Sequence, residues 1–234
     1  IALLNPWDLA AICGGYWHLD QIPYNNFRDI KINSLDINSN ELFVAINGKN
    51  RDGHSYVKNL RAPAAAIVER PVTIARVPQL IVMSTTDALV KLAEAFIQET
   101  DALKIAITGS VGKTGTKEML ARCLRQFGPT HANQGNFNNY LGVPLTILSM
   151  SSPISYLVTE MGMNSKGEIS PLSRLVQPNI AIITNVSEAH IGHMNSLEDV
   201  ANEKASICAG MSSDGCIILP RDNDQYPILE KAAI

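Results

Sequence analysis

The chain has 234 residues, of which 46% are apolar and 18% charged, so it can bury the core of one large or two modest globular domains. Its 19 basic and 22 acidic residues give a formal charge of −3, which argues against the broad basic face of a nucleic-acid-binding protein. No apolar run approaches the roughly 18 residues of a membrane span. Four cysteines without CxxC spacing favour reduced thiols over a zinc site or a disulfide scaffold, so we expect a cytoplasmic protein.

Residues 1–83 form a first region in which short strand candidates alternate with turn residues. Asn5-Pro6 is typical of a helix N-cap followed by a first-turn proline, and Gly14-Gly15 would end that helix. Asn47-Gly48 and Asp52-Gly53 indicate turns, which either bind a ligand or only reverse the chain. The strand candidates are residues 42–46, 65–68 and 80–83. We therefore expect a small mixed α/β domain here.

Residues 84–234 show helical stretches that alternate with apolar strand candidates. A helical pattern over residues 87–98 places Leu89, Leu92, Ala93 and Phe96 on one face. The strand candidates are residues 103–107, 156–159, 180–184 and 216–219. This alternation predicts an α/β domain with a mostly parallel sheet and helices on its faces. Ligands of such sheets bind at the carboxyl ends of the strands.

The run TGSVGKT, from Thr108 to Thr114, follows the first of these strands and precedes a helix-forming stretch. Small residues let successive backbone N–H groups converge on a phosphate, and the helix adds the positive end of its dipole. Lys113 supplies a charge for the terminal phosphates, and Thr114 a hydroxyl that can ligate magnesium. The general pattern would place glycine where Ile107 stands, so this is a shortened variant, and a purely structural turn is the alternative. The predicted ATP-binding residues are Thr108, Gly109, Ser110, Val111, Gly112, Lys113, Thr114 and Gly115.

Three more candidate residues lie at or beyond expected strand ends. Glu160 closes the candidate strand 156–159 and is suited to hold the magnesium of ATP, although an acid at such a position is commonly solvated or a helix cap. His190 follows the next strand and suits a second metal, but a single histidine is more often structural, and the nearby His193 leaves the choice open. Lys204 lies in a helical stretch, where a lysine is normally a solvated surface residue.

The segment GNFNNYLGVP, residues 135–144, is dense in amide side chains beside glycine. Because asparagine both donates and accepts hydrogen bonds, Asn136, Asn138 and Asn139 are suited to grip a polar ligand. Turn chemistry alone would also explain this composition.

Five segments follow one another along the chain, namely LFVAINGKNRDGH, TGSVGKTGTKEML, GNFNNYLGVPLTIL, VTEMGMNSKGEI and NVSEAHIGHMNSLEDVANEK. Together they resemble the motifs of the Mur ligase family, and the resemblance covers nearly the whole chain. The family's short phosphate loop also accounts for Ile107. GNFNN and MGMNSKGEI resemble most closely the members that join D-Ala-D-Ala to UDP-N-acetylmuramoyl-tripeptide, rather than those that add the third amino acid.

The resemblance implies a monomeric, three-domain, cytoplasmic ligase that forms an amide bond at the expense of ATP in cell-wall synthesis. Residues 1–83 would hold the UDP end of the substrate, and the domain from residue 84 would hold ATP. The substrate carboxylate would be phosphorylated to an acyl phosphate, which the amine of D-Ala-D-Ala attacks. Since the chain stops at Ile234, we expect an incomplete central domain and no C-terminal ligase domain.

The resemblance also implies roles for individual residues. Thr114 and Glu160 correspond to ligands of one magnesium ion, and His190 to a ligand of a second. Lys204 corresponds to the lysine that these enzymes carbamylate, a change that turns a cation into an anion beside the metal. Lys113, Glu160, His190 and Lys204 would thus be the catalytic residues. The loop that faces the muramoyl substrate corresponds to Asn136, Asn138 and Asn139.

Two departures from the family pattern stand out. Near the uridine site, where the family reads Asp-Ser-Arg or Asp-Thr-Arg, this chain reads Asn33-Ser34-Leu35, so Ser34 stays a candidate substrate contact and the arginine is absent. Beside the adenine, Pro220 stands where the family has asparagine. Two alternatives stay open from the sequence, namely another Mur-type amino-acid ligase and a nucleotide-binding module without ligase activity.

Overall fold

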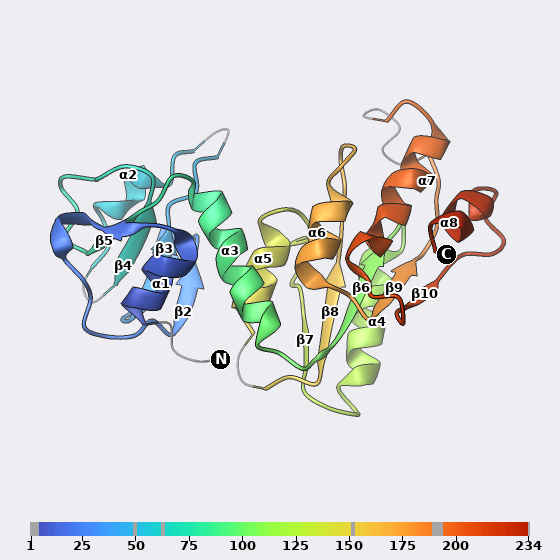
Figure 1. The fold of residues 1–234 in the computed structure, drawn as a ribbon, viewed down its shortest axis with the longest axis horizontal. Helices are drawn as coiled ribbons and strands as arrows, with labels where there is room; N and C mark the ends of the chain where they lie inside the picture. The colour runs from blue at the N-terminus through green and yellow to red at the C-terminus, as the bar shows by residue number, and fades with distance from the viewer. Residues whose placement is uncertain (1–4, 49–50, 62–63, 151–152, 189–193, 234) are drawn as a thin grey trace. The chain divides into compact units, whose positions relative to one another are not determined.

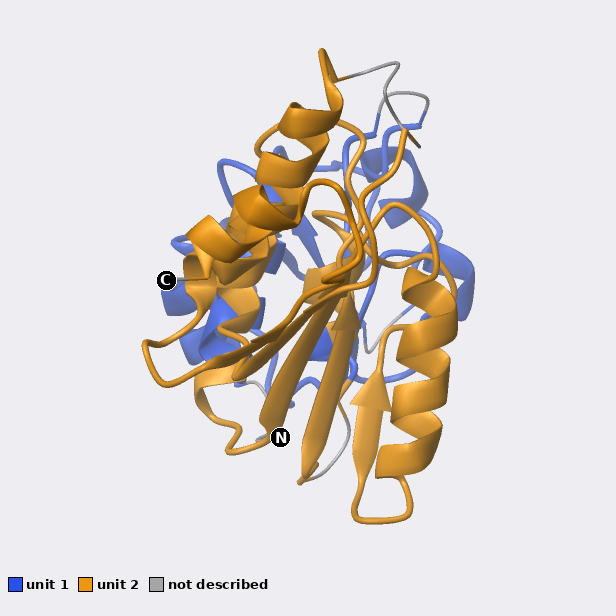
Figure 2. Ribbon diagram, turned by 90° about the vertical axis from the view of Figure 1, so that its right-hand side faces the viewer, with its two compact units in different colours: residues 1–96, 147–149 blue, residues 97–146, 150–234 orange. Residues whose placement is uncertain are grey.

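The computed structural model describes residues 5–48, 51–61, 64–150, 153–188 and 194–233 (Figure 1). The chain divides into two compact units, unit 1 with residues 1–96 and 147–149, and unit 2 with residues 97–146 and 150–234 (Figure 2). The division lies within α3 (Thr85–Gln98), later in the chain than residue 83. Which ligand each predicted domain binds stays a prediction.

Unit 1 contains a five-stranded sheet in the order β1-β5-β4-β3-β2. β1 is antiparallel to β5, and the other neighbours are parallel. Every residue of β3, β4 and β5 is buried, as expected of inner strands covered on both faces. The strands are β1 (Tyr16–Trp17), β2 (Asp29–Lys31), β3 (Glu41–Val44), β4 (Ala65–Val68) and β5 (Gln79–Ile81). The other elements are α1 (Pro6–Cys13), α2 (His54–Val57) and the 3-10 helices η1 (His18–Asp20) and η2 (Ser34–Asp36).

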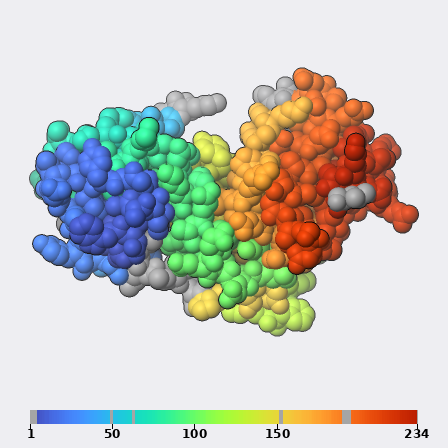
Figure 3. Space-filling model, viewed as in Figure 1, coloured from blue at the N-terminus to red at the C-terminus, as the bar shows by residue number. Residues whose placement is uncertain are grey.

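The first helix, α1, begins and ends where the sequence predicts. Asn5 Oδ1 accepts hydrogen bonds from the N–H groups of Trp7 at 2.9 Å and Asp8 at 2.8 Å. Gly14 ends the helix in the left-handed conformation, with φ +66°. α1 lies at the surface of unit 1, coloured dark blue in Figure 3, and buries Pro6, Leu9 and Cys13. The sequence did not predict β1 and β2, because strands of two and three residues carry too short an apolar pattern.

Unit 2 contains a five-stranded sheet in the order β10-β9-β6-β8-β7, in which all neighbours are parallel. The strands are β6 (Leu103–Thr108), β7 (Thr130–Ala132), β8 (Tyr156–Glu160), β9 (Ile180–Ile183) and β10 (Cys216–Ile218). The helices are α4 (Lys113–Leu124), α5 (Gly142–Leu148), α6 (Ile169–Val176), α7 (Leu197–Ala205), η4 (Ser206–Gly210) and α8 (Tyr226–Ala232). The predicted parallel sheet is confirmed, and the half-buried edge strand β7 escaped prediction because it has no apolar run.

Helices lie on both sides of this sheet (Figure 2). On one face Ile105, Ile107 and Val158 form a cluster with Ala121 of α4. β6 is the middle strand of the sheet, with β9 on one side and β8 on the other. Its carboxyl end leads into the phosphate loop, which begins between the ends of these two strands. In the part of the chain that the structure describes, no helix is long and apolar enough to cross a membrane.

Candidate nucleotide-binding site

The phosphate loop turns between β6 and α4 through two glycines. Gly109 has φ +150° and Gly112 has φ +83°, both in the region that favours glycine. A Cβ on Gly109 would lie 1.9 Å from Thr184 Oγ1, so no larger residue fits there without movement. Gly112 immediately precedes the first turn of α4, whose free N–H groups and dipole favour an anion.

The segment after β9 holds the loop in place. Thr184 Oγ1 donates to the carbonyl of Val111 at 2.6 Å, and the N–H of Val111 donates to Asn185 Oδ1 at 2.9 Å. Ser110 Oγ donates to the carbonyl of Ser187 at 3.0 Å and accepts from its N–H at 2.9 Å. The sequence analysis missed Thr184, Asn185 and Ser187 as site residues, and their only signal was a position just after a strand next to β6.

The lysine of the loop lies over the loop itself. Lys113 Nζ donates to the carbonyl of Gly109 at 2.7 Å and to that of Ser110 at 3.3 Å. Burial lowers the pKa of Lys113, and the nearby Glu160 carboxylate opposes the shift. The ammonium group therefore lies where a phosphate held by the loop would meet it.

Glu160 joins two other predicted residues. Its side chain is buried, and Oε2 accepts from Thr114 Oγ1 at 2.8 Å while Oε1 accepts from Asn138 Nδ2 at 2.7 Å. A Cβ on Gly162 would lie 2.8 Å from Asn138 Cγ, so the glycine after β8 lets this amide approach the acid. The structure thus rules out a merely solvated Glu160 and brings together residues from α4, β8 and the asparagine-rich segment.

The neighbouring asparagines show the turn chemistry that the sequence left as an alternative. Asn139 Oδ1 accepts from the N–H groups of Leu141 at 3.2 Å and Gly142 at 2.9 Å, at the start of α5. Asn136 is exposed, and its carbonyl accepts from the N–H of Asn138 at 2.8 Å. Their contact with a substrate stays a prediction. Gly115, predicted with the loop, lies inside α4.

Lys204 is not the solvated surface lysine that its sequence context indicated. Its side chain is only 1% exposed, on a helix that also buries Val200, Ala201, Glu203 and Ala205. Burial lowers the pKa of Lys204 to about 8, the positive charge of Lys113 adds to this shift, and Glu203 opposes it. The charges of Lys113 and Lys204 therefore act on each other. Only the solvated alternative is wrong, because the packing around α7 cannot be inferred from an isolated helical pattern, and the predicted catalytic and metal-binding role of Lys204 stays a prediction.

The neighbour of Lys204 anchors α7. Glu203 accepts from the N–H of Gly167 at Oε2 (2.7 Å) and from the N–H of Ile169 at Oε1 (2.8 Å), where α6 begins. Lys166 and Asp199 add a link at 2.8 Å between the same segments. The glycine-glutamate-isoleucine motif is therefore tied to the helix that carries Lys204.

Two further predicted residues, His190 and Ser34, lie outside the described part of unit 2. His190, like His193, lies outside the residues that the structure describes. Ser34 lies in unit 1, at the start of η2, where Asn33 Oδ1 accepts from the N–H of Leu35 at 3.2 Å. Leu35 is exposed.

The donor set fits a magnesium polyphosphate. Thr114 and Glu160 offer oxygen ligands of the kind that magnesium prefers. Thr108 Oγ1, at the end of β6, is buried without a hydrogen-bond partner in the described structure, which leaves a polar atom for a ligand to satisfy. Among the residues described, no group of three His, Cys, Asp or Glu side chains could hold a metal, so the threonine hydroxyl is an essential part of the fit.

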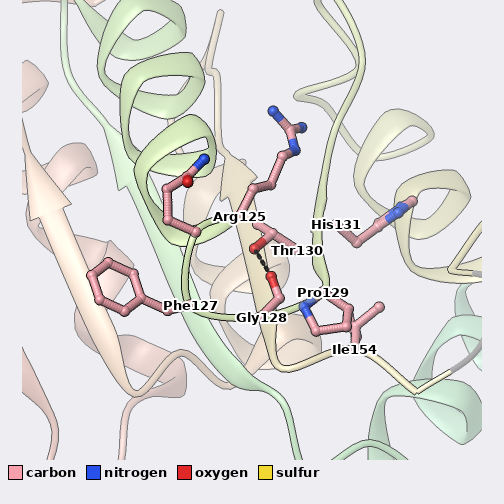
Figure 4. Close-up of a pocket in the computed structure, with 8 residues that line it drawn as sticks. Arg125, Phe127, Gly128, Pro129, Thr130, His131 and Ile154 are labelled. Atoms are coloured by element: carbon pink, nitrogen blue, oxygen red, sulfur yellow. Dashed lines mark hydrogen bonds between the residues drawn. The ribbon is translucent and has the colours of Figure 1, made fainter.

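A separate cavity of about 650 Å³ lies at the opposite end of α4 (Figure 4). Its lining includes Arg125, Phe127 and His131, and Thr130 Oγ1 donates to the carbonyl of Gly128 at 2.9 Å beside it. None of the predicted site residues lines this cavity. This cavity is therefore separate from the predicted nucleotide-binding residues.

The sequence of unit 2 matches a known family. The model of the Mur ligase middle domain matches residues 107–234, which include the loop, Glu160 and Lys204. The chain belongs to the Mur ligase family. It is 40% identical over 204 residues to the UDP-N-acetylmuramoyl-tripeptide--D-alanyl-D-alanine ligase of Rickettsia prowazekii (strain Madrid E), a match that covers 86% of this chain and 45% of the relative.

Solved structures agree with this assignment. MurF from Acinetobacter baumannii superposes with a TM-score of 0.93 at 36% identity, over 100% of this chain and 52% of that one. MurF from Thermotoga maritima, solved in complex with ADP, superposes with a TM-score of 0.77 at 30% identity, over 88% of this chain and 48% of that one. The chain therefore spans about half the length of the relatives that it matches.

Proposed function

We propose that this chain is the ATP-binding and UDP-substrate-binding part of a ligase that joins D-Ala-D-Ala to UDP-N-acetylmuramoyl-tripeptide in peptidoglycan precursor synthesis. The observation that carries the proposal is the hydrogen-bonded set of Thr114, Glu160 and Asn138 beside the phosphate loop. Similarity to relatives that bear this activity in their names supports it. The protein would act in the cytoplasm as a monomer.

In this proposal the backbone from Thr108 to Gly115 cradles the phosphates of ATP. Lys113 neutralises charge on the terminal phosphates, because its ammonium already lies against the loop. Thr114 and Glu160 would hold a magnesium ion, which when bound offsets the charge that otherwise repels a carboxylate from a polyphosphate.

The reaction follows from these charges. A carboxylate oxygen of the tripeptide attacks the γ-phosphorus of ATP, the bond to the bridging oxygen breaks, and ADP leaves. The amine of D-Ala-D-Ala then attacks the carbonyl carbon of the acyl phosphate, phosphate leaves, and the nitrogen loses a proton. Asn136, Asn138 and Asn139 would orient the muramoyl group, and Ser34 in unit 1 would contact the UDP end.

Lys204 and His190 complete the proposed site. The buried Lys204 amine would add to CO₂ and lose a proton, so that a carbamate replaces the ammonium group. Together with His190, the carbamate would hold a second magnesium ion. Burial beside the charge of Lys113 supports this role, since both effects disfavour a second ammonium group there.

ADP release tests the proposal. On a full-length version, release should require both UDP-N-acetylmuramoyl-tripeptide and D-Ala-D-Ala, and Lys113→Ala should lower the rate by roughly two or more orders of magnitude while the protein stays folded. Dependence on a single amino acid instead of D-Ala-D-Ala would indicate another Mur-type ligase. A Lys113→Ala rate close to that of the parent would refute the assignment of the loop.

One alternative stays open from the sequence, a nucleotide-binding module without ligase activity of its own. The same assay on the 234-residue chain and on a full-length version distinguishes the two hypotheses. A part of a ligase would release ADP only in the full-length version, whereas a module would bind nucleotide yet release no ADP in either.

A further inference from the structure

One buried amide holds the backbone of Glu160 from both sides. Asn133 directly follows β7, and its Oδ1 accepts from the N–H of Glu160 at 2.9 Å while its Nδ2 donates to the carbonyl of Glu160 at 3.0 Å. The residue pairing of β7 with β8 ends at Ala132 and Val158, so the side chain of Asn133 takes over where the strand pairing stops. Asn133 is 2% exposed, and water therefore cannot replace these bonds without a local opening.

The same amide also holds the other partner of the carboxylate. Asn133 Nδ2 donates to the carbonyl of Phe137 at 2.9 Å, immediately before Asn138. Asn138 in turn donates to Glu160 Oε1. Asn133 thus fixes the main chain at both ends of the Asn138–Glu160 hydrogen bond.

A buried lysine connects this amide to the helix of the phosphate loop. Lys117 Nζ donates to the carbonyl of Asn133 at 2.7 Å, and its side chain is 0% exposed. Lys117 lies about one turn after Lys113 on α4. Because a buried ammonium group is costly to leave without partners, this contact ties Asn133 to the helix that also carries Thr114.

We infer that Asn133, held by Lys117, is a positioning residue that sets the place of the Glu160 carboxylate relative to the Thr114 hydroxyl. It touches neither nucleotide nor metal in this inference. This role of Asn133 rests on the proposed function, because a change at Asn133 would be measured as a change in magnesium affinity. A purely structural role would instead weaken the fold and every ligand contact together.

Binding of the non-hydrolysable analogue β,γ-imido-ATP to the 234-residue chain, titrated in Mg²⁺ and in EDTA, tests the inference. The parent should bind more tightly in Mg²⁺, and Glu160→Gln should lose most of that gain. Asn133→Ala should keep its affinity in EDTA but lose roughly 10-fold or more of the gain from Mg²⁺, the usual effect of removing a partner of a metal ligand. Asn133→Asp, which keeps the size but loses both donated bonds, should behave in the same way.

Ser173→Ala is the matched control, because Ser173 is also buried and accepts from the N–H of Gly210 at 3.0 Å, but on α6. It should leave the gain from Mg²⁺ unchanged even if it lowers thermal stability. An unchanged gain in a folded Asn133 variant would overturn the inference, and so would equal weakening in Mg²⁺ and EDTA or failure of both Asn133 variants to fold. A parent that binds no nucleotide would instead refute the proposed function.

Discussion

The two units build similar sheets but bury different kinds of polar side chain. Unit 2 buries the charged residues Lys117, Glu160, Glu203 and Lys204, and all except Glu203 have a direct or electrostatic link to the phosphate-loop region. Unit 1 buries Glu41, His54, Gln79 and Thr85. Buried lysines are rare unless they are paired, and both have an acidic neighbour here: Lys117 Nζ lies 2.9 Å from Glu118 Oε1, and Glu203 acts electrostatically on Lys204.

Two buried polar side chains of unit 1, His54 and Thr85, have hydrogen-bond partners within that unit. His54 Nδ1 lies 2.6 Å from Asp52 Oδ1, and Nε2 accepts from the N–H of Glu69 at 2.8 Å. Glu69 Oε1 accepts in turn from the N–H of Thr85 at 3.0 Å and from its hydroxyl at 3.1 Å. These hydrogen bonds hold a loop to strands, whereas the Thr108 hydroxyl in unit 2 has no partner among the described residues and can accept one from a ligand. A buried polar side chain can therefore either stabilise the fold, as His54 does, or offer an atom to a ligand, as Thr108 does.

Among the substitutions considered, those of Lys204 in unit 2 should have the largest effect on activity. Lys204→Ala in a full-length enzyme should be nearly inactive, because the acyl phosphate loses a metal that offsets its charge. Acetate or formate should restore part of the activity by occupying the space of the carbamate, as measured by ADP release. Lys204→Arg should not recover activity, since arginine cannot be carbamylated and places a fixed cation in the site. Near-parental activity of the arginine variant, or no rescue of the alanine variant, would count against the carbamate.

Gly109→Ala should have the next largest effect, confined to unit 2. The new Cβ would overlap Thr184 Oγ1, so we expect a loss of stability of about 1–3 kcal/mol and weaker binding of ATP analogues, measured by urea unfolding and by titration. Cys123→Ala is the matched control, because Cys123 is exposed near the other end of α4. Equal nucleotide affinities for the two variants would show that the shape of the loop does not depend on the contact with Thr184.

His54→Leu should have the smallest effect on nucleotide binding while it destabilises unit 1. It leaves the N–H of Glu69 without its partner and removes one of the partners of the Asp52 carboxylate, so we expect about 1–3 kcal/mol less stability in urea unfolding. Ser55→Ala, at an exposed position of the same helix, should cost less. A drop in nucleotide affinity as large as that of Gly109→Ala would contradict the division of roles between the units.

Local chemistry made several elements predictable from the sequence. Asn5-Pro6 and Gly14 define α1 because capping involves only neighbouring residues. The inner strands of unit 2 were predicted because each carries its own apolar run, whereas β7 depends on its pairing with β8. Strand ends differ by one to two residues, as in β3 (Glu41–Val44) against the predicted 42–46, because hydrogen bonding to a neighbour decides where a strand stops.

The sequence by itself determined the family, the parallel sheet, the phosphate loop, and Thr114, Glu160 and Asn138 as candidates, since motifs carry that information in order along the chain. Only the tertiary structure decided that one carboxylate joins Thr114 and Asn138, that Lys204 is buried, and that Asn133 and Lys117 support Glu160. The physical reason is that burial and hydrogen-bond partners belong to pairs of segments far apart in the sequence, and no periodicity within one segment encodes them.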